Sequence, residues 1–179
     1  MKQDTIRPQA VIEAPRMVLR PLRTSDAGRL QMYHADKRVA GMTTSIPHPL
    51  PPGAAENYIG NFLKPGRACQ AWVMDATAFG GSEFLGLITL DQMDRNQSEI
   101  GYWVAPALWN TGFASEAVQA LVDANPMDNQ TIFASVFQDN PGSARVLTNA
   151  GFDYLGDAEA FSVARGAKVA TWTYLKRLA

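Results

Sequence analysis

Apolar and polar positions alternate along the chain in short blocks, and the spacing inside each block predicts its secondary structure. Short apolar runs bounded by turn residues predict seven strands, at residues 17–20, 71–74, 83–90, 99–104, 132–136, 152–155 and 170–175. Apolar residues three and four positions apart predict four helices. The first begins near residues 24–26, the second covers residues 54–63, the third covers residues 112–124, and the fourth begins at Asn140. The cluster of prolines within residues 43–52 predicts a loop.

The order of these elements favours a mixed α+β fold. A strand and two helices are followed by three strands, a helix, a strand, a helix and two strands. Gly80, Gly81 and Ser82 between the second and third strands predict an antiparallel hairpin, which disfavours a doubly wound parallel sheet. We therefore expect one domain over residues 1–179, with a single mixed, mostly antiparallel sheet flanked by helices. Residues 1–14 are expected to form an extended lead-in.

The composition is that of a globular protein without a strong net charge. Of the 179 residues, 46% are hydrophobic and 18% are charged, which suffices for a core without disulfides or metals. A net charge of −1 disfavours a protein that holds nucleic acid on a broad basic face. No apolar leader follows Met1, and the apolar run at 84–90 is too short to cross a bilayer. These features indicate a cytoplasmic protein with no nucleic-acid or membrane partner.

Thiol and imidazole side chains are too few and too scattered to suggest a metal site. Cys69 is the sole cysteine, and its apolar surroundings in the sequence predict a buried structural thiol. His34 is expected on the surface of the first helix, and His48 lies in the proline-rich loop. One cysteine and two separated histidines offer no zinc-binding spacing.

Charge is unevenly distributed along the chain. Residues 1–40 carry eight basic and four acidic side chains, whereas residues 81–160 carry eleven acidic and two basic ones, Arg95 and Arg145. Such an acidic segment either forms a solvated surface or attracts a cationic substrate such as an amine. The sequence leaves both interpretations open.

The segment at 104–117 joins a predicted strand to a predicted helix and carries a candidate anion site. Gly112 and Ala114 place small side chains where the backbone enters the helix. The first N–H groups of a helix are unpaired, and the helix dipole favours an anion beside them. The turn therefore fits a pyrophosphate, although a plain strand-to-helix connection has the same local pattern.

A second segment, residues 140–152, has the pattern of a capped helix. Asn140 and Pro141 suit the N-cap and first helical position, and Gly151 suits the helix end. The two segments in this order are more specific than either alone.

Together these segments resemble the GNAT superfamily of N-acetyltransferases, in particular the branch that acetylates the N-terminal amine of ribosomal proteins. The family's acyl-CoA signature is Arg/Gln-x-x-Gly-x-Gly/Ala, and in this branch it often runs Tyr-Trp-Gly-x-Gly-Tyr-Ala-Thr-Glu-Ala. Residues 109–117 follow this pattern closely. Residues 99–106, 140–152 and 16–27 are similar to the strand before the signature, the later motif and the N-terminal pattern of the branch. The resemblance spans residues 14–176.

This resemblance implies a fold and a set of binding residues. The sheet would have a V-shaped split between the strands at 99–104 and 132–136, and acetyl-CoA would enter that split. Strand backbone would bind the pantetheine, the Gly112 turn would bind the pyrophosphate, and Asn140 with Ser143 would lie near the thioester. The implied binding residues are Trp103, Val104, Ala105, Trp109, Asn110, Thr111, Gly112, Phe113, Ala114, Ser115, Asn140 and Ser143.

Two positions depart from the family pattern. Asn110 replaces a frequent glycine, but asparagine tolerates left-handed backbone angles, so the turn can still form. Leu147 stands where many members carry a tyrosine that protonates the leaving thiolate. That proton must therefore come from another group.

The implied reaction is direct transfer of an acetyl group from acetyl-CoA to a primary amine, either a protein N-terminus or a small-molecule amine. It needs a base for the amine and an acid for the thiolate. We assign the base to Glu99, directly or through water, and the acid to Ser143. Two plainer roles stay open: Glu99 as a solvated carboxylate at a strand end, and Ser143 as a ligand of the pantetheine or a helix cap.

Two other functions fit parts of the sequence. The missing tyrosine permits a module that binds acyl-CoA without transferring the acyl group. The Gly112 turn permits a nucleotide-binding protein, but the hairpin order and the lack of a lysine after the glycine argue against it. The resemblance places the loop around His48 beside the acceptor pocket, and it leaves a homodimer open.

Overall fold

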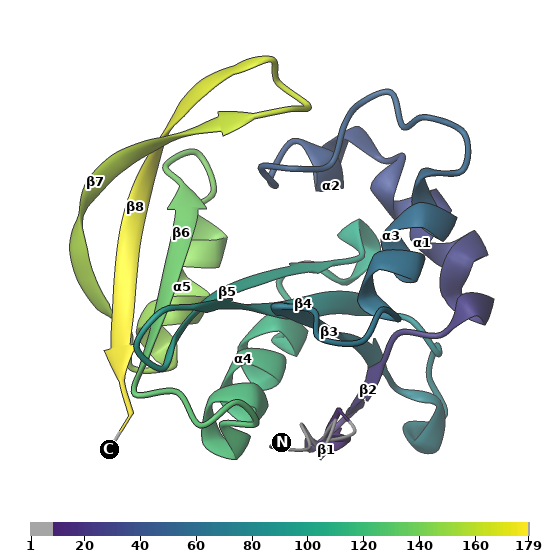
Figure 1. Ribbon diagram of the computed structural model, residues 1–179, viewed down its shortest axis with the longest axis horizontal. Helices are drawn as coiled ribbons and strands as arrows, with labels where there is room; N and C mark the ends of the chain where they lie inside the picture. Colours follow the sequence, from purple (N-terminus) through teal and green to yellow (C-terminus); the bar gives the residue numbers. More distant parts are fainter. Residues whose placement is uncertain (1–8, 179) are drawn as a thin grey trace, which may run out of the picture.

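The computed structural model describes residues 9–178, which form one sheet of eight strands with helices on both faces (Figure 1). The order across the sheet is β1-β2-β3-β4-β5-β6-β8-β7. The strands are β1 (Ile12–Glu13), β2 (Val18–Pro21), β3 (Cys69–Asp75), β4 (Gly86–Met93), β5 (Gln97–Val104), β6 (Thr131–Phe137), β7 (Asp153–Ser162) and β8 (Ala167–Arg177). This confirms the expected α+β class.

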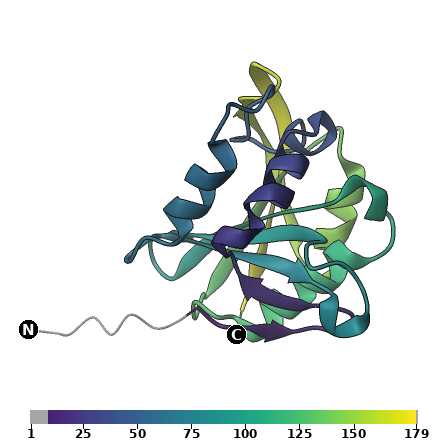
Figure 2. The same ribbon diagram turned by 90° about the vertical axis from the view of Figure 1, so that its right-hand side faces the viewer.

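In the described part of the chain, five α-helices and three single-turn 3-10 helices connect the strands. The α-helices are α1 (Ala27–His34), α2 (Lys37–Ala40), α3 (Ala54–Phe62), α4 (Phe113–Ala124) and α5 (Pro141–Asn149). The 3-10 helices are η1 (Thr24–Asp26), η2 (Thr77–Phe79) and η3 (Pro106–Leu108). Figures 1 and 2 show α1, α2 and α3 on one side of the sheet, and α4 with α5 on the other.

The sheet is split between β5 and β6. These strands pair in parallel from Gln97↔Thr131 to Glu99↔Phe133, where their register ends. Every other neighbouring pair of described strands is antiparallel. Beyond Glu99, β5 continues beside β4 while β6 continues beside β8, so the two halves of the sheet diverge. The expected V-shaped split is therefore present.

Each face of the sheet has its own apolar core. On the α4 and α5 side, Val118, Leu121 and Leu147 are buried against strand residues. On the other side, Leu30 of α1 and Ile59 of α3 pack on the strands. Burying an aliphatic side chain of this size stabilises the fold by roughly 1.5–3 kcal/mol. The buried helix positions are three and four residues apart, which is why their periodicity predicted the helices.

Several elements differ from the sequence-based expectations. Part of the expected lead-in forms β1, and residues 1–8 lie outside the described part of the chain. The helix α2 was not anticipated, because its four residues are too few to show a period. The helix α1 has Asp26 as its N-cap, without a side-chain cap hydrogen bond, and the Asp26 carboxylate accepts the Arg23 N–H at 2.8 Å.

His34 lies in the core, not on the surface as the sequence suggested. It is 2% exposed, and its ring contacts Tyr58 at 5.0 Å and Trp103 at 5.4 Å between centroids. Leu30 and His34 are one helical turn apart, so they share the face of α1 that packs inward. Its Nε2 has no hydrogen-bond partner among the described residues, and burial lowers the pKa of His34 to about 4.

Cys69 is half-buried, rather than fully buried as expected. Burial, followed by the nearby Asp91 charge, raises its pKa to about 11. The thiol is therefore protonated at neutral pH, which agrees with a structural role. Within residues 9–178, none of the helices has the length and apolarity to cross a membrane.

Candidate active site

The free edge of β5 lines the split in the sheet. The Ala105 N–H donates to the Leu85 carbonyl at 2.8 Å, so it bonds toward β4. Hydrogen-bonding directions alternate along an antiparallel strand, and this directs the N–H and C=O of Tyr102 and the N–H of Val104 toward the split. The sequence had placed Ala105 among the residues that bind the pantetheine. The structure instead buries Ala105 and uses its N–H inside the sheet.

The turn before α4 has the backbone geometry of an anion site. Asn110 and Gly112 adopt positive φ angles of 62° and 85°, so Asn110 does take the left-handed conformation expected of it. Gly112 is the N-cap of α4, and no side chain caps the helix. The first N–H groups of this twelve-residue helix are therefore available to an anion at its positive end.

The side chain of Arg16 forms hydrogen bonds to this turn and to the first turn of α4. Its Nη2 donates to the Thr111 carbonyl at 3.0 Å, and its Nε donates to Glu116 at 2.9 Å. The guanidinium also lies over the Phe113 ring, 4.1 Å from its centroid. Arg16 thus ties the loop to the first turn of α4, which holds the backbone N–H groups in place.

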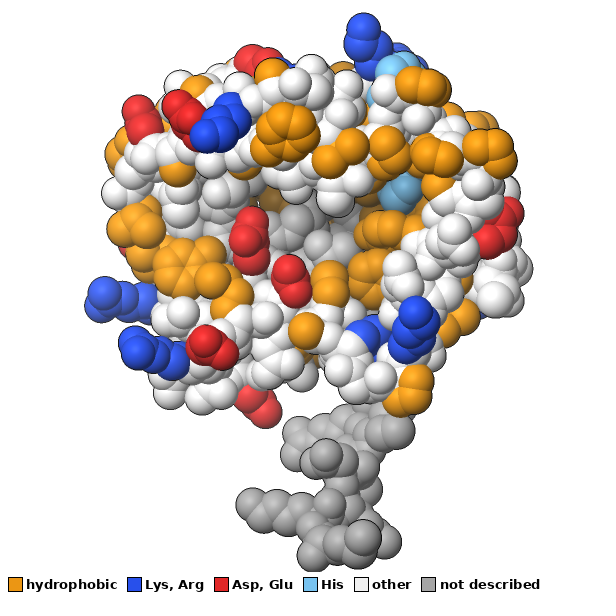
Figure 3. Space-filling model, turned by 45° about the horizontal axis from the view of Figure 1, so that its top comes forward, with side chains coloured by type: hydrophobic (Ala, Val, Ile, Leu, Met, Phe, Trp, Pro, Cys, Tyr) orange, Lys and Arg blue, Asp and Glu red, His pale blue; other side chains and the backbone are white. Residues whose placement is uncertain are grey.

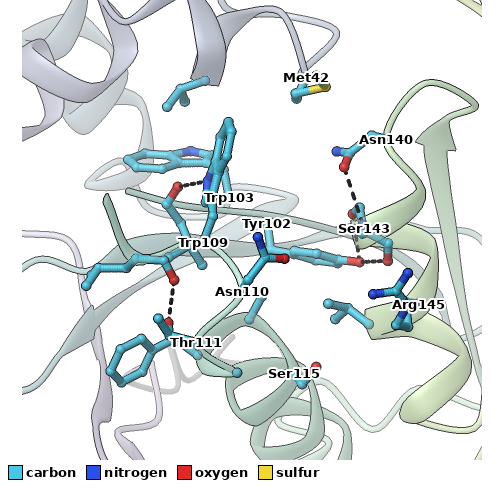
Figure 4. A pocket seen from close by; sticks show the side chains of 18 of the residues that line it. Met42, Tyr102, Trp103, Trp109, Asn110, Thr111, Ser115, Asn140, Ser143 and Arg145 are labelled. Atoms are coloured by element: carbon cyan, nitrogen blue, oxygen red, sulfur yellow. Dashed lines mark hydrogen bonds between the residues drawn. The ribbon is translucent and has the colours of Figure 1, made fainter. Parts of the chain in front are cut away.

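A cavity of about 520 Å³ extends from this turn along β5 to α5 (Figure 4). Apart from Ala105, all the residues that the sequence implied for acetyl-CoA line it: Trp103, Val104, Trp109, Asn110, Thr111, Gly112, Phe113, Ala114, Ser115, Asn140 and Ser143. Arg38 of α2 and Arg145 of α5 also line it, and they supply the positive charge that a phosphate needs. Nothing in the sequence pointed to Arg38, which lies more than 60 positions before the β5 and α4 residues that line the same cavity.

A second cavity, of about 420 Å³, opens on the other side of the split. Its floor includes Leu87, Asp91 and Glu99, and its walls include Tyr58 of α3 and Phe137 of β6. Figure 3 shows a hollow at the centre of this face, with acidic side chains at its border and apolar ones around it. His48 is not among the residues that line either cavity, although the adjoining part of its loop, residues 42–46, lines the second.

The two cavities meet at one cluster of side chains. Met42, Tyr102, Trp103, Asn140 and Ser143 line both of them. The Ser143 hydroxyl donates to the Tyr102 hydroxyl at 3.0 Å, and Tyr102 donates to the Ser143 carbonyl at 2.8 Å. Asn140 caps α5 by accepting the Ser143 N–H at 3.4 Å. A group bound in one cavity can therefore reach a group bound in the other at Ser143.

Sequence reasoning missed two residues of this cluster, Met42 and Tyr102. Tyr102 lies 41 positions from Ser143, and only the packing of β5 against α5 brings the two hydroxyls together. Burial raises the pKa of Tyr102 well above its usual value, so its hydroxyl stays protonated at neutral pH. Leu147, at the position of the usual tyrosine, is fully buried in the core and presents no polar group.

Glu99 lies at the point where β5 and β6 diverge, on the floor of the second cavity. It is exposed to the cavity and stands directly across from Asp91 on β4. Partial burial and then the Asp91 charge raise the pKa of Glu99. A raised pKa makes a carboxylate a better base, provided that it is ionised at the working pH.

Comparison with known proteins identifies the family. Residues 16–153 match the family described as the acetyltransferase (GNAT) domain. The chain belongs to the GNAT acetyltransferase family. This makes it an enzyme of the acyltransferase class.

Two curated relatives of this GNAT chain are N-acetyltransferases of Bacillus. It is 34% identical over 92 residues to the uncharacterized N-acetyltransferase YoaA of Bacillus subtilis, a match that spans 50% of the chain and 51% of that relative. It is 26% identical over 170 residues to the uncharacterized N-acetyltransferase p20 of Bacillus licheniformis, over 90% of the chain and 94% of that relative.

Solved structures share the GNAT fold over nearly the whole chain. The microcin C7 self-immunity acetyltransferase MccE, in complex with acetyl-CoA and AMP, has a TM-score of 0.81 at 13% identity and covers 97% of this chain and 99% of its own. RimJ of Mycobacterium smegmatis has a TM-score of 0.77 at 20% identity and covers 94% of this chain and 86% of its own. Spermidine N-acetyltransferase of Vibrio cholerae has a TM-score of 0.73 at 17% identity and covers 89% of this chain and 95% of its own.

Proposed function

We propose that this GNAT enzyme transfers the acetyl group of acetyl-CoA directly to a primary amine. The donor occupies the 520 Å³ cavity and the amine occupies the 420 Å³ cavity. The observation that carries this proposal is that the two cavities meet at Ser143 and Tyr102. Direct transfer requires both reactants to be held side by side, and two joined cavities achieve that positioning.

The donor cavity suits acetyl-CoA in its backbone and in its charge. The turn at Asn110 and Gly112 offers helix N–H groups to the pyrophosphate, and Arg38 and Arg145 lie along the same cavity. The backbone of Tyr102 and Val104 bonds the pantetheine amides in the manner of an added strand. The complex of the similarly folded MccE with acetyl-CoA supports this assignment.

The acceptor cavity suits an amine. Asp91 and Glu99 give its floor negative charge, while Tyr58 and Phe62 give it apolar walls. Carboxylates attract an ammonium group toward the cavity. A small-molecule amine and a protein N-terminus both present such a group, and similarly folded enzymes named for spermidine and for ribosomal proteins illustrate both kinds.

Within this site, Glu99 accepts the proton of the attacking amine, directly or through a water. A strand N–H that faces the split stabilises the negative charge that develops on the carbonyl oxygen. Ser143 donates its hydroxyl proton to the CoA thiolate as it leaves and regains a proton from solvent, while the protonated Glu99 releases its proton to solvent, so that both groups return to their starting state. Tyr102 orients the Ser143 hydroxyl and is not itself ionised, because burial raises its pKa.

The test combines binding with turnover. Titration calorimetry of the purified protein with acetyl-CoA and with ATP should give micromolar binding of the first and not of the second, and amines should then trigger thiol release. Glu99→Gln and Ser143→Ala should each lower kcat at saturating acetyl-CoA, with binding of acetyl-CoA retained. Unchanged turnover in either variant would remove that residue from the mechanism.

One observation favours a second candidate, an acyl-CoA-binding module without transfer activity. Leu147 leaves the usual tyrosine position apolar and buried. That candidate predicts acetyl-CoA binding with no thiol release from any amine, including peptides with free N-termini. Thiol release above the rate without an amine would exclude it.

A further inference from the structure

Two distant segments of the chain meet above the acceptor cavity. One follows α2, at residues 41–44, and the other is the turn between β7 and β8, at residues 162–165. We call these two segments together the bridge. Figure 1 shows the β7–β8 hairpin leaning over β6 toward the end of α2.

Hydrogen bonds close the bridge across its full width. The Val163 N–H donates to the Thr44 carbonyl at 3.0 Å. The hydroxyl of Ser162, a residue with no exposed surface, donates to the Thr43 carbonyl at 3.3 Å. Because these bonds join residues about 120 positions apart, the bridge is a tertiary contact and not part of either local turn.

Arg165 connects the bridge to the sheet. Its Nε donates to the Gly41 carbonyl at 2.7 Å, and its guanidinium pairs with both oxygens of Asp139, at 3.0 Å for Nη2 to Oδ1. The guanidinium also lies 4.8 Å from the centroid of the Phe137 ring. One side chain therefore holds three parts of the chain together: the β7–β8 turn, the segment after α2 and the end of β6.

The bridge forms part of the wall of the acceptor cavity. Met42, Thr43 and Thr44 line that cavity from one side of the bridge, and Ala160 of β7 lines it close to the other. Phe137, beneath the Arg165 guanidinium, lines it as well. Separation of the two segments would therefore enlarge the acceptor cavity without changing the donor turn at Gly112.

We propose that Arg165 determines acceptor specificity, because it holds the bridge closed and so limits the bulk of the amine that the acceptor cavity admits. This inference rests on the proposed function, since it requires the amine to occupy the second cavity. Arg165 lines neither cavity, so it acts by positioning the wall and not by touching the substrate. The hydrogen bonds between the Arg165 guanidinium and the Asp139 carboxylate join two charged groups, so they are stronger than hydrogen bonds between neutral groups.

The experiment compares Arg165→Ala and Arg165→Lys with the unmodified enzyme on primary amines of increasing bulk: n-butylamine, cyclohexylmethylamine and 1-naphthylmethylamine. Thiol release at saturating acetyl-CoA gives kcat/KM for each amine. The size ratio is kcat/KM for 1-naphthylmethylamine divided by kcat/KM for n-butylamine. We expect Arg165→Ala to raise this ratio about tenfold, the factor that a lost hydrogen bond to a charged group can produce. Lysine keeps the charge opposite Asp139 but not the forked geometry, so the ratio should be intermediate.

Arg29→Ala is the matched control, because Arg29 also forms an ion pair, with Glu83 at 3.0 Å, and lines neither cavity. It should leave the ratio unchanged. Hydrogen exchange provides a second measurement: the Val163 amide should exchange faster in Arg165→Ala, while amides of α4 should not. Unchanged acetyl-CoA affinity verifies that each variant is folded.

The outcomes separate this inference from the proposed function. Thiol release by the unmodified enzyme with an unchanged size ratio in both Arg165 variants would overturn the inference and leave the proposed function standing. A changed ratio in Arg29→Ala would also overturn it. The absence of thiol release with any amine would overturn the proposed function, and this inference with it.

Discussion

At the scale of single residues, the chemistry that we propose for the site depends on one pair of hydroxyls. The Tyr102 hydroxyl accepts a hydrogen bond from the Ser143 hydroxyl and donates one to the Ser143 carbonyl. We predict that Tyr102→Phe, which keeps the ring, lowers kcat roughly three- to tenfold with little change in KM for acetyl-CoA, since it removes the hydrogen bond that orients the acid. In steady-state kinetics, Tyr102→Phe should add no further loss to Ser143→Ala. Multiplicative losses in the double variant would contradict a shared role.

A second residue-scale prediction concerns His34, which is buried as a neutral base. The unfolded chain binds a proton below pH 6.5, whereas the folded chain binds it only near its lowered pKa of about 4. The contribution of His34 to the free energy of unfolding is therefore fully present above pH 6.5. It falls as the pH drops toward 4, by about 2 kcal/mol between pH 7 and pH 5. His34→Phe should remove this loss when urea unfolding is measured at both pH values. An equal fall in stability in this variant would assign the effect to other groups.

At the scale of elements, the β4–β5 ladder places Asp91 directly across from Glu99, and this like charge contributes to the raised pKa of Glu99. If Glu99 is the base, kcat/KM falls as the pH drops through that pKa. Asp91→Asn should then shift the acidic limb of the pH–rate profile to lower pH. Asp94→Asn, in the turn of the same hairpin, is the control and should leave the limb in place. An acidic limb that persists in Glu99→Gln would assign the titration to another residue.

Also at the scale of elements, the sequence predicted those features of the fold that depend on residues close together in the chain. Gly112 and Asn110 favour left-handed backbone by their own structure, so the backbone conformation of the turn before α4 could be predicted without knowledge of the fold. The strand β7 was predicted as four residues, because it is an edge strand whose mostly exposed positions lack an apolar pattern. The Tyr102–Ser143 pair and the bridge could not be predicted, since they depend on strand register and on packing between segments far apart in the chain.

At the scale of the whole molecule, one buried ion cluster ties the N-terminal strand β2 to the rest of the sheet. The side chain of Arg20 is 11% exposed, and it pairs with Asp26 at 2.8 Å and with Asp75 at 2.7 Å. Both carboxylates are buried. The cluster joins the start of the α1 region to the end of β3, on the opposite side of β4 from the split. We therefore expect it to contribute to folding and not to the chemistry proposed at Ser143.

We predict that Arg20→Met, which keeps the apolar stem, lowers the free energy of unfolding by about 3–5 kcal/mol, because it leaves the buried Asp26 without its ion pair and Asp75 with only the more distant Arg23, at 3.5 Å. Urea unfolding at pH 7 measures this change. Arg29→Met removes an ion pair whose side chains are 44% and 47% exposed, so it should cost less than about 1 kcal/mol. Well below the melting temperature, kcat of Arg20→Met should equal that of the unmodified enzyme, since Arg20 lines neither cavity. A large loss of kcat with unchanged stability would instead show that the cluster positions the active site.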